Sequence, residues 1–153
     1  MDMLSNVEIV ILSFFTSLGF GIVFQIRKND LIYAALGGMF TRIVYLLLMA
    51  FVPYRIVYAA LAAFFAAIYA EILAYYKKTP ATLFLYPSII PLIPGDLFYY
   101  TMGGIVMGNR ELFADNVVEC ILALVGISIG FVLSSSISHY MRRFRIAKTS
   151  PNV

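Results

Sequence analysis

Four long apolar stretches constrain the fold of this chain more than any other feature of its sequence. They cover approximately residues 4–26, 31–52, 54–76 and 116–140. A helix of about 20 residues spans the hydrocarbon core of a bilayer, which is about 30 Å thick. The stretches therefore predict an all-α integral membrane protein in which residues 1–153 form a single transmembrane domain.

The composition supports this class and excludes others. The 153 residues are 62% hydrophobic and 12% charged, whereas about 25% of the residues of a soluble domain are charged. A globule of this size cannot bury so large an apolar excess in one core. We therefore exclude a soluble enzyme, a disordered tail and a nucleic-acid binder.

A further apolar segment, residues 83–108, is interrupted by helix-breaking residues. Pro87, Pro91 and Pro94 follow one another closely, and Gly95 comes directly after the third proline. Because proline removes a backbone donor and collides with the preceding turn, one straight helix is unfavourable here. We predict about five transmembrane helices, of which the fourth is broken at Pro94-Gly95. The pattern leaves open whether this segment crosses the bilayer or re-enters it.

Basic residues are distributed unequally between the two ends of these helices. With five crossings, Arg55 and Arg110 lie on one side, and Arg42 lies within a span. The other eight basic residues share the opposite side: Arg27, Lys28, Lys77, Lys78, Arg142, Arg143, Arg145 and Lys148. Positive charge accumulates in cytoplasmic loops. The distribution predicts an N-terminus outside the cell and a cytoplasmic C-terminus, with a polar tail over residues 141–153.

Small residues recur at helical spacing in three of the apolar stretches. They are Ser13, Ser17 and Gly21; Ala59, Ala63 and Ala67; and Gly126 with Gly130. Such stripes allow helix backbones to approach closely in lipid. We favour packing within the chain, and an interface with another subunit, including a homo-oligomer, is the alternative.

The break at Pro94-Gly95 is the first candidate site. A half-helix that begins there would present a partial positive charge and unpaired backbone donors, which transporters use to hold a substrate carboxylate. Asp96 is placed to cap this half-helix. Asp96, Tyr99 and Tyr100 share one helical face, and Thr101 could complete a polar wall. A kinked helix with Asp96 as a simple cap is the alternative.

The role of Asp96 is open. Its carboxylate could repel a substrate carboxylate, bind a substrate ammonium group or carry a proton. Acids at membrane depth are costly and by default functional.

Arg42 lies midway along the second span, where a charge costs about 2.5–3.5 kcal/mol. We expect it to face the bundle or a cavity and to pair with Asp96 or Glu71. We expect it either to bind a substrate carboxylate, or to form a structural ion pair or extend to an interface. Glu71 precedes Lys77 and Lys78 by a few residues, so we expect it to pair near the interface rather than to act in transport.

Catalysis and cofactor chemistry find no support in the sequence. Cys120 and His139 are the only residues of their kinds, which excludes a multi-cysteine or two-histidine metal site. The chain has no GxSxG, HExxH or phosphate-loop motif. We expect neither a catalytic residue, nor a metal, nor a cofactor.

Three motifs resemble the threonine/serine exporter family. The run from Phe20 to Phe24 before a polar turn is similar to the end of that family's first span. Ala34-Ala35-Leu36-Gly37-Gly38 followed by Arg42 is similar to its second span. The run from Pro91 to Gly95, with Tyr99 and Met102, resembles its proline-glycine signature. The resemblance covers approximately residues 5–140. After the signature, this chain has Asp96, Leu97 and Phe98 where the family often has small residues.

The resemblance implies the small module of a two-part exporter that needs a larger membrane subunit as its partner. Family activities are export of threonine and serine and, in some split systems, of C4-dicarboxylates such as succinate, driven by the proton gradient. We expect a multi-pass protein of the bacterial inner membrane that exports threonine or serine. Candidate substrate-binding residues are Arg42, Pro94, Gly95, Asp96, Tyr99, Tyr100 and Thr101. A C4-dicarboxylate exporter subunit, a non-transporting assembly scaffold and a channel are the alternatives.

Overall fold

The computed structural model describes the backbone of residues 3–149 and the side chains of residues 6–137. The elements are α1 (Met3–Val23), α2 (Lys28–Phe51), α3 (Arg55–Lys77), α4 (Thr82–Ile89), the short 3₁₀ helix η1 (Ile90–Leu92), α5 (Gly95–Met107) and α6 (Arg110–Thr149). The described residues contain no strand. Within residues 3–149, four helices are long and apolar enough to cross a membrane, or up to five if a bent pair is counted as one span. The predicted all-α membrane fold is confirmed.

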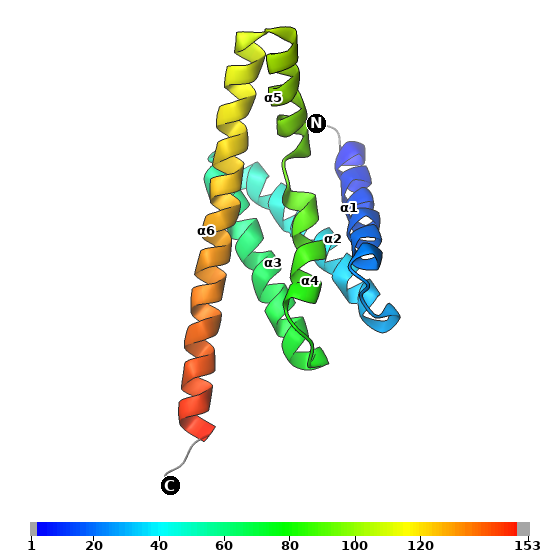
Figure 1. Cartoon of the computed structure of the whole chain (residues 1–153), viewed down its shortest axis with the longest axis vertical. Helices are drawn as coiled ribbons and strands as arrows, with labels where there is room; N and C mark the ends of the chain where they lie inside the picture. The colour runs from blue at the N-terminus through cyan, green and yellow to red at the C-terminus, as the bar shows by residue number, and fades with distance from the viewer. Residues whose placement is uncertain (1–2, 150–153) are drawn as a thin grey trace.

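The bent pair is the interrupted segment of the sequence. Its two arms, Thr82–Leu92 and Gly95–Met107, meet at an angle of 52°. Figure 1 shows α5 continuing toward the same end of the molecule as α4, after which α6 returns along the whole length of the bundle. Gly108 makes this return with a φ of 65°, a left-handed conformation that suits glycine. By length and composition, the bent pair is thus a candidate for a fifth span that is broken between Leu92 and Gly95.

The helices form two packed groups that meet at α3. α1 packs on α2, and α2 also contacts α3 and α4. α6 packs along α3 and, beyond it, along α5, so α5 and the adjoining part of α6 project past the other helices (Figure 1). The core has two clusters of buried residues. One joins α2 and α3 to Leu92 and to Ile127 of α6, and the other lies where α2, α3 and α4 meet. α5 depends mainly on α6 for its contacts.

The small-residue stripes pack within the chain. A Cβ atom at Gly126 would lie 2.5 Å from the carbonyl oxygen of Ile56, and one at Gly130 would collide with the carbonyl oxygen of Ala60. Ala59 and Ala63 are fully buried opposite these glycines. Ser17, on the stripe of α1, is likewise fully buried. The packing interpretation is therefore confirmed for the contacts between α3 and α6.

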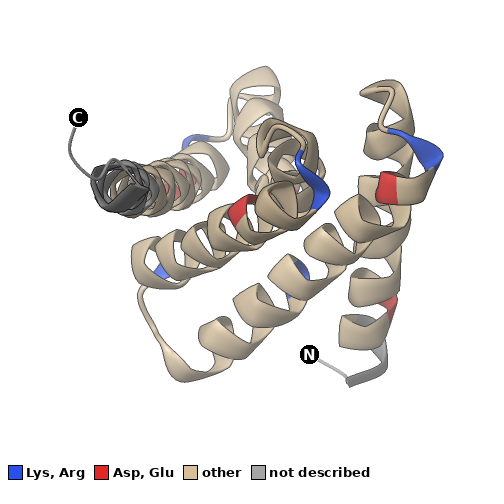
Figure 2. Ribbon diagram, turned by 90° about the horizontal axis from the view of Figure 1, so that it is seen from below, with Lys and Arg blue, Asp and Glu red and all other residues tan. Residues whose placement is uncertain are grey.

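Basic side chains mark one end of the bundle. The α1–α2 turn and the α3–α4 turn both lie at the lower end in Figure 1, and Figure 2 views the same end from below. Lys77 Nζ lies 3.2 Å from Asp30 Oδ1 and 4.1 Å above the Tyr33 ring. The ion pair joins the end of α3 to the start of α2. We expected Glu71 to pair near the interface, but the ion pair that the described residues form at this end joins Lys77 to Asp30 instead.

The last helix is longer than the sequence predicted. α6 begins at Arg110 and continues to Thr149, whereas we expected a span over 116–140 followed by a tail. Its 40 residues extend about 60 Å at about 1.5 Å per residue, about twice the hydrocarbon thickness. Helical backbone therefore continues through most of the expected tail, and residues 150–153 lie outside the described part of the chain.

Candidate substrate cavity

The break between α4 and α5 leaves backbone carbonyls that other helices satisfy. Pro91 has no N–H, so the carbonyl oxygen of Pro87 lacks its usual donor four residues later. Ser17 Oγ of α1 donates to this oxygen at 2.8 Å, and the bond is buried. Broken backbone at membrane depth is stable only where protein or water satisfies it. α1 therefore supplies a partner that the proline removed.

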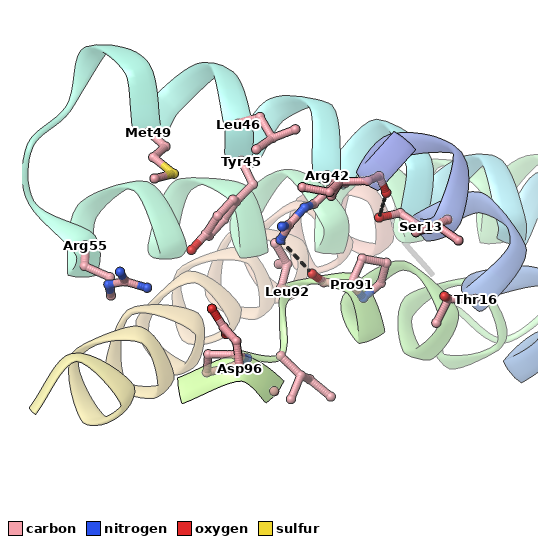
Figure 3. Close-up of a pocket in the computed structure, with 15 residues that line it drawn as sticks. Ser13, Thr16, Arg42, Tyr45, Leu46, Met49, Arg55, Pro91, Leu92 and Asp96 are labelled. Carbon is pink, nitrogen blue, oxygen red and sulfur yellow. Dashed lines mark hydrogen bonds between the residues drawn. The ribbon is translucent and has the colours of Figure 1, made fainter. Parts of the chain in front are cut away.

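Arg42 likewise donates to an open backbone carbonyl, that of Pro91, one helical turn after Pro87. The Gly95 N–H bonds to the carbonyl oxygen of Ile93 at 2.8 Å instead of reaching back to Pro91. Arg42 Nη1 of α2 donates to the Pro91 carbonyl oxygen at 3.1 Å. The guanidinium group is thereby fixed beside the break. Figure 3 shows this bond.

The glycine pair of α2 permits this close assembly. A Cβ atom at Gly38 would collide with Ser17 and lie 3.2 Å from the Pro87 carbonyl oxygen. A Cβ atom at Gly37 would collide with Ser88 of α4. Larger residues here would push α2 away from α1 and α4. The glycines therefore position Arg42 against the break.

A cavity of about 520 Å³ opens beside the break. Small-molecule sites have volumes of about 300–1,000 Å³. The walls come from α1, α2, the start of α3 and the segment from Pro91 to Asp96. Its polar side chains are Ser13, Thr16, Arg42, Tyr45, Arg55 and Asp96. Figure 3 shows the Asp96 carboxylate, the Tyr45 hydroxyl and the Arg55 guanidinium directed toward one space.

Arg42 keeps donors for a ligand. It is half-buried, and its guanidinium carbon lies 5.1 Å from the centre of the Tyr45 ring. Its Nε is buried without a hydrogen-bond partner among the described residues. A guanidinium has five N–H donors, and the bond to Pro91 uses one of them. We expected an ion pair with Asp96 or Glu71. No described carboxylate forms an ion pair with Arg42, and its hydrogen bond goes to the Pro91 carbonyl oxygen instead.

Asp96 lies in the first turn of α5 and lines the cavity. We expected it to cap the helix, and this was wrong. α5 begins at Gly95, Pro94 is its N-cap residue, and no side chain makes a cap hydrogen bond. The Phe98 N–H bonds to the Pro94 carbonyl oxygen at 3.1 Å, so the helix starts one residue earlier than expected. The Asp96 carboxylate is exposed to the cavity instead.

The other predicted site residues are divided between the cavity and α5. Pro94 and Gly95 line the cavity with Arg42 and Asp96. The side chains of Tyr99, Tyr100 and Thr101 do not line it. Tyr99 is 75% exposed and Tyr100 is 50% exposed. Thr101 is buried on the side of α5 that faces α6, and its hydroxyl has no hydrogen-bond partner among the described residues. Their part in substrate binding stays a prediction.

Arg55 is a cavity residue that the sequence analysis missed. We had counted it only as an extramembrane charge. It is the first residue of α3 and points into the cavity (Figure 3), and its Nε lies 2.5 Å from Oε2 of Glu119 on α6. One signal was present, because Arg42, Arg55 and Arg110 are the basic residues outside the large basic group. Two of these three line the cavity.

Comparison with known proteins identifies the family. The family model described as "Threonine/Serine exporter, ThrE" matches residues 9–137. This range contains every residue that lines the cavity. We found no match among curated proteins and none among solved structures. Because the family model covers most of a multi-pass helical chain, this protein belongs to the threonine/serine exporter family of membrane transporters.

Proposed function

We propose that this chain is a subunit of a secondary exporter and that the cavity beside the break binds threonine or serine. The observation that carries the proposal is the presence of Arg42 and Asp96 in the walls of one cavity. An α-amino acid is a zwitterion, so it needs one cationic and one anionic partner. The free donors of Arg42 suit its carboxylate, and Asp96 suits its ammonium group.

The remaining polar walls suit the rest of such a substrate. Ser13, Thr16 and Tyr45 supply hydroxyl groups that can hydrogen-bond the hydroxyl of threonine or serine. The first turn of α5 also leaves backbone N–H groups without intrahelical partners. These donors lie next to Asp96 and add to the attraction for a carboxylate.

We also propose a larger membrane subunit of the same family as the partner. The resemblance of this chain to the small module supports this assignment. Alternating access would move the two modules around the broken helix, as in other transporters with discontinuous helices. Tyr99 and Tyr100 follow Asp96 along α5 and are exposed. We therefore include them, together with Thr101, in the proposed substrate path. The proposed location is the bacterial inner membrane, with the N-terminus outside and the C-terminus in the cytoplasm.

One observation favours a second candidate substrate. Arg55 also lines the cavity, so two guanidinium groups stand in the walls of one site. A C4-dicarboxylate such as succinate would use both. The threonine/serine assignment uses Asp96 in addition, which a dicarboxylate would not.

The test is efflux from cells that express this chain together with the proposed larger subunit. Cells are loaded with threonine, serine and succinate, and the appearance of each in the medium is measured with and without a proton gradient. We expect gradient-dependent efflux of threonine and serine that neither subunit alone supports. Flux that ignores the gradient would indicate a channel.

A scaffold predicts a different outcome in the same system. The Asp96→Ala and Tyr99→Phe variants are expected to impair efflux while both subunits still assemble in the membrane. Normal efflux in both variants would contradict the site. A chain that positions its partner without binding substrate would tolerate both changes.

A further inference from the structure

The second arginine of the cavity is held by a residue from outside it. Arg55 lines the cavity, whereas Glu119 of α6 does not. The two side chains form an ion pair with an Nε–Oε2 distance of 2.5 Å. The Arg55 side chain is 25% exposed, and that of Glu119 is 45% exposed. Glu119 therefore acts on the cavity through Arg55 rather than by direct contact.

The charges around the cavity balance only when Glu119 is counted. The ionisable side chains that line it, apart from tyrosine, are Arg42, Arg55 and Asp96. These three leave one excess positive charge. The carboxylate of Glu119 cancels this excess at Arg55. With the pair formed, the site presents one free cation, Arg42, opposite one anion, Asp96.

We propose that Glu119 sets the charge selectivity of this cavity by neutralising Arg55, so that a zwitterion is favoured over a dicarboxylate. This inference rests on the proposed function and identifies a specificity-determining residue for it. A zwitterion carries no net charge and finds its two partners in Arg42 and Asp96. A dianion needs a second free cation, which Arg55 becomes only when Glu119 releases it.

The competing explanation is that the Arg55–Glu119 ion pair has a purely structural role. The pair would then join α3 to α6 and have no effect on which substrate is exported. These two helices are already in direct contact where Gly126 and Gly130 meet the backbone of α3. Exposed ion pairs contribute little to stability. Loss of the Glu119 charge should therefore leave the helices packed and change the electrostatics of the cavity.

The Glu119→Gln variant separates the two roles in the co-expression system described above. The measured quantity is the ratio of succinate efflux to threonine efflux in cells loaded with both. We expect this ratio to rise roughly tenfold, because removal of one unit charge near a partly buried site alters a ligand's energy substantially at an effective dielectric constant of about 20. Asp115→Asn is the matched control. It removes the same charge one turn earlier on α6 at an exposed position, and the ratio should not change.

Two further variants keep the inference testable if Glu119→Gln assembles poorly. Arg55→Gln leaves the Glu119 carboxylate without its partner, so the ratio should fall below that of the wild type. The double variant Arg55→Gln/Glu119→Gln should return the ratio toward the wild-type value, as expected for two residues that act through one interaction.

The outcomes distinguish this inference from the proposed function. If the wild type exports threonine, and Glu119→Gln and Arg55→Gln both keep the wild-type ratio of succinate efflux to threonine efflux, the inference is overturned and the proposed function stands. If the wild type exports neither compound, the proposed function fails, and the inference fails with it. A rise in the ratio for Asp115→Asn equal to that for Glu119→Gln would also overturn the inference, because the effect would then come from surface charge in general.

Discussion

Arg42 Nη1 lies 3.1 Å from the carbonyl oxygen of Pro91, and this bond joins the charge of α2 to the break in the fourth span. One side chain thus meets two needs. It satisfies a carbonyl that the broken helix leaves open, and it places the remaining guanidinium donors in the cavity. The cost of an arginine at membrane depth is offset by the backbone bond and by the Tyr45 ring, 5.1 Å away.

This double role predicts that Arg42→Gln impairs both stability and transport. A hydrogen bond from a charged group contributes about 1.5–3 kcal/mol. We therefore expect the free energy of unfolding of the purified protein, measured by thermal denaturation, to fall by about that amount. Efflux of threonine should fall further than stability alone explains, because the carboxylate ligand is lost. Arg110→Gln, at an exposed position, is the control for loss of a positive charge. Full efflux in Arg42→Gln would remove Arg42 from the site.

The exposure of Asp96 to the cavity predicts a substrate-dependent effect of Asp96→Asn. If the carboxylate binds an ammonium group, threonine efflux should fall about tenfold or more, since a charged hydrogen bond is worth about 1.5–3 kcal/mol and 1.4 kcal/mol is a factor of ten. Succinate has no ammonium group, so its efflux should not decrease. Glu111→Gln, on the exposed start of α6, should alter neither. Equal losses for both substrates would argue against ammonium binding.

The Ser17–Pro87 bond predicts that Ser17→Ala destabilises the protein. The Pro87 carbonyl oxygen would lose the donor that replaces the missing N–H of Pro91, and an unsatisfied buried acceptor costs about 1–3 kcal/mol. The measurement is thermal unfolding in detergent. Ser128→Ala is a matched control, because the Ser128 hydroxyl is exposed and bonds only to Leu124 of its own helix. Equal melting temperatures for the two variants would show that the bond to Pro87 contributes nothing.

Alanine should have opposite effects at two glycines, because Gly130 packs against α3 and Gly103 of α5 faces open space. At Gly130 a Cβ atom would collide with the backbone of Ala60, so Gly130→Ala should separate the helices and lower the unfolding temperature. At Gly103 a Cβ atom would meet nothing within 4 Å. Gly103→Ala should raise stability by up to about 1 kcal/mol, the difference in helix propensity. A neutral Gly130→Ala would mean that α3 and α6 are not tightly packed there.

The number and type of the helices were predictable from the sequence, because both depend on local properties of the chain. Apolar runs of about 20 residues require helices that satisfy their own backbone in lipid. Pro94 and Gly95 break the fourth span whatever surrounds them. The boundary of α6 was less predictable, since helix continues beyond the apolar run to Thr149.

The partners of the charged residues depended on tertiary packing. The sequence showed that Arg42 needed a partner but favoured Asp96 or Glu71, because it could not show that the Pro91 carbonyl would be open and within reach. It marked Arg55 as an extramembrane charge, because nothing local brings the start of α3 beside Glu119, 64 positions later. Hydropathy and proline positions act along the chain, and the sequence by itself determined a broken-helix membrane protein. Which groups face the cavity was decided only when Gly37 and Gly38 allowed α1, α2 and α4 to meet, because that contact joins residues far apart in the sequence.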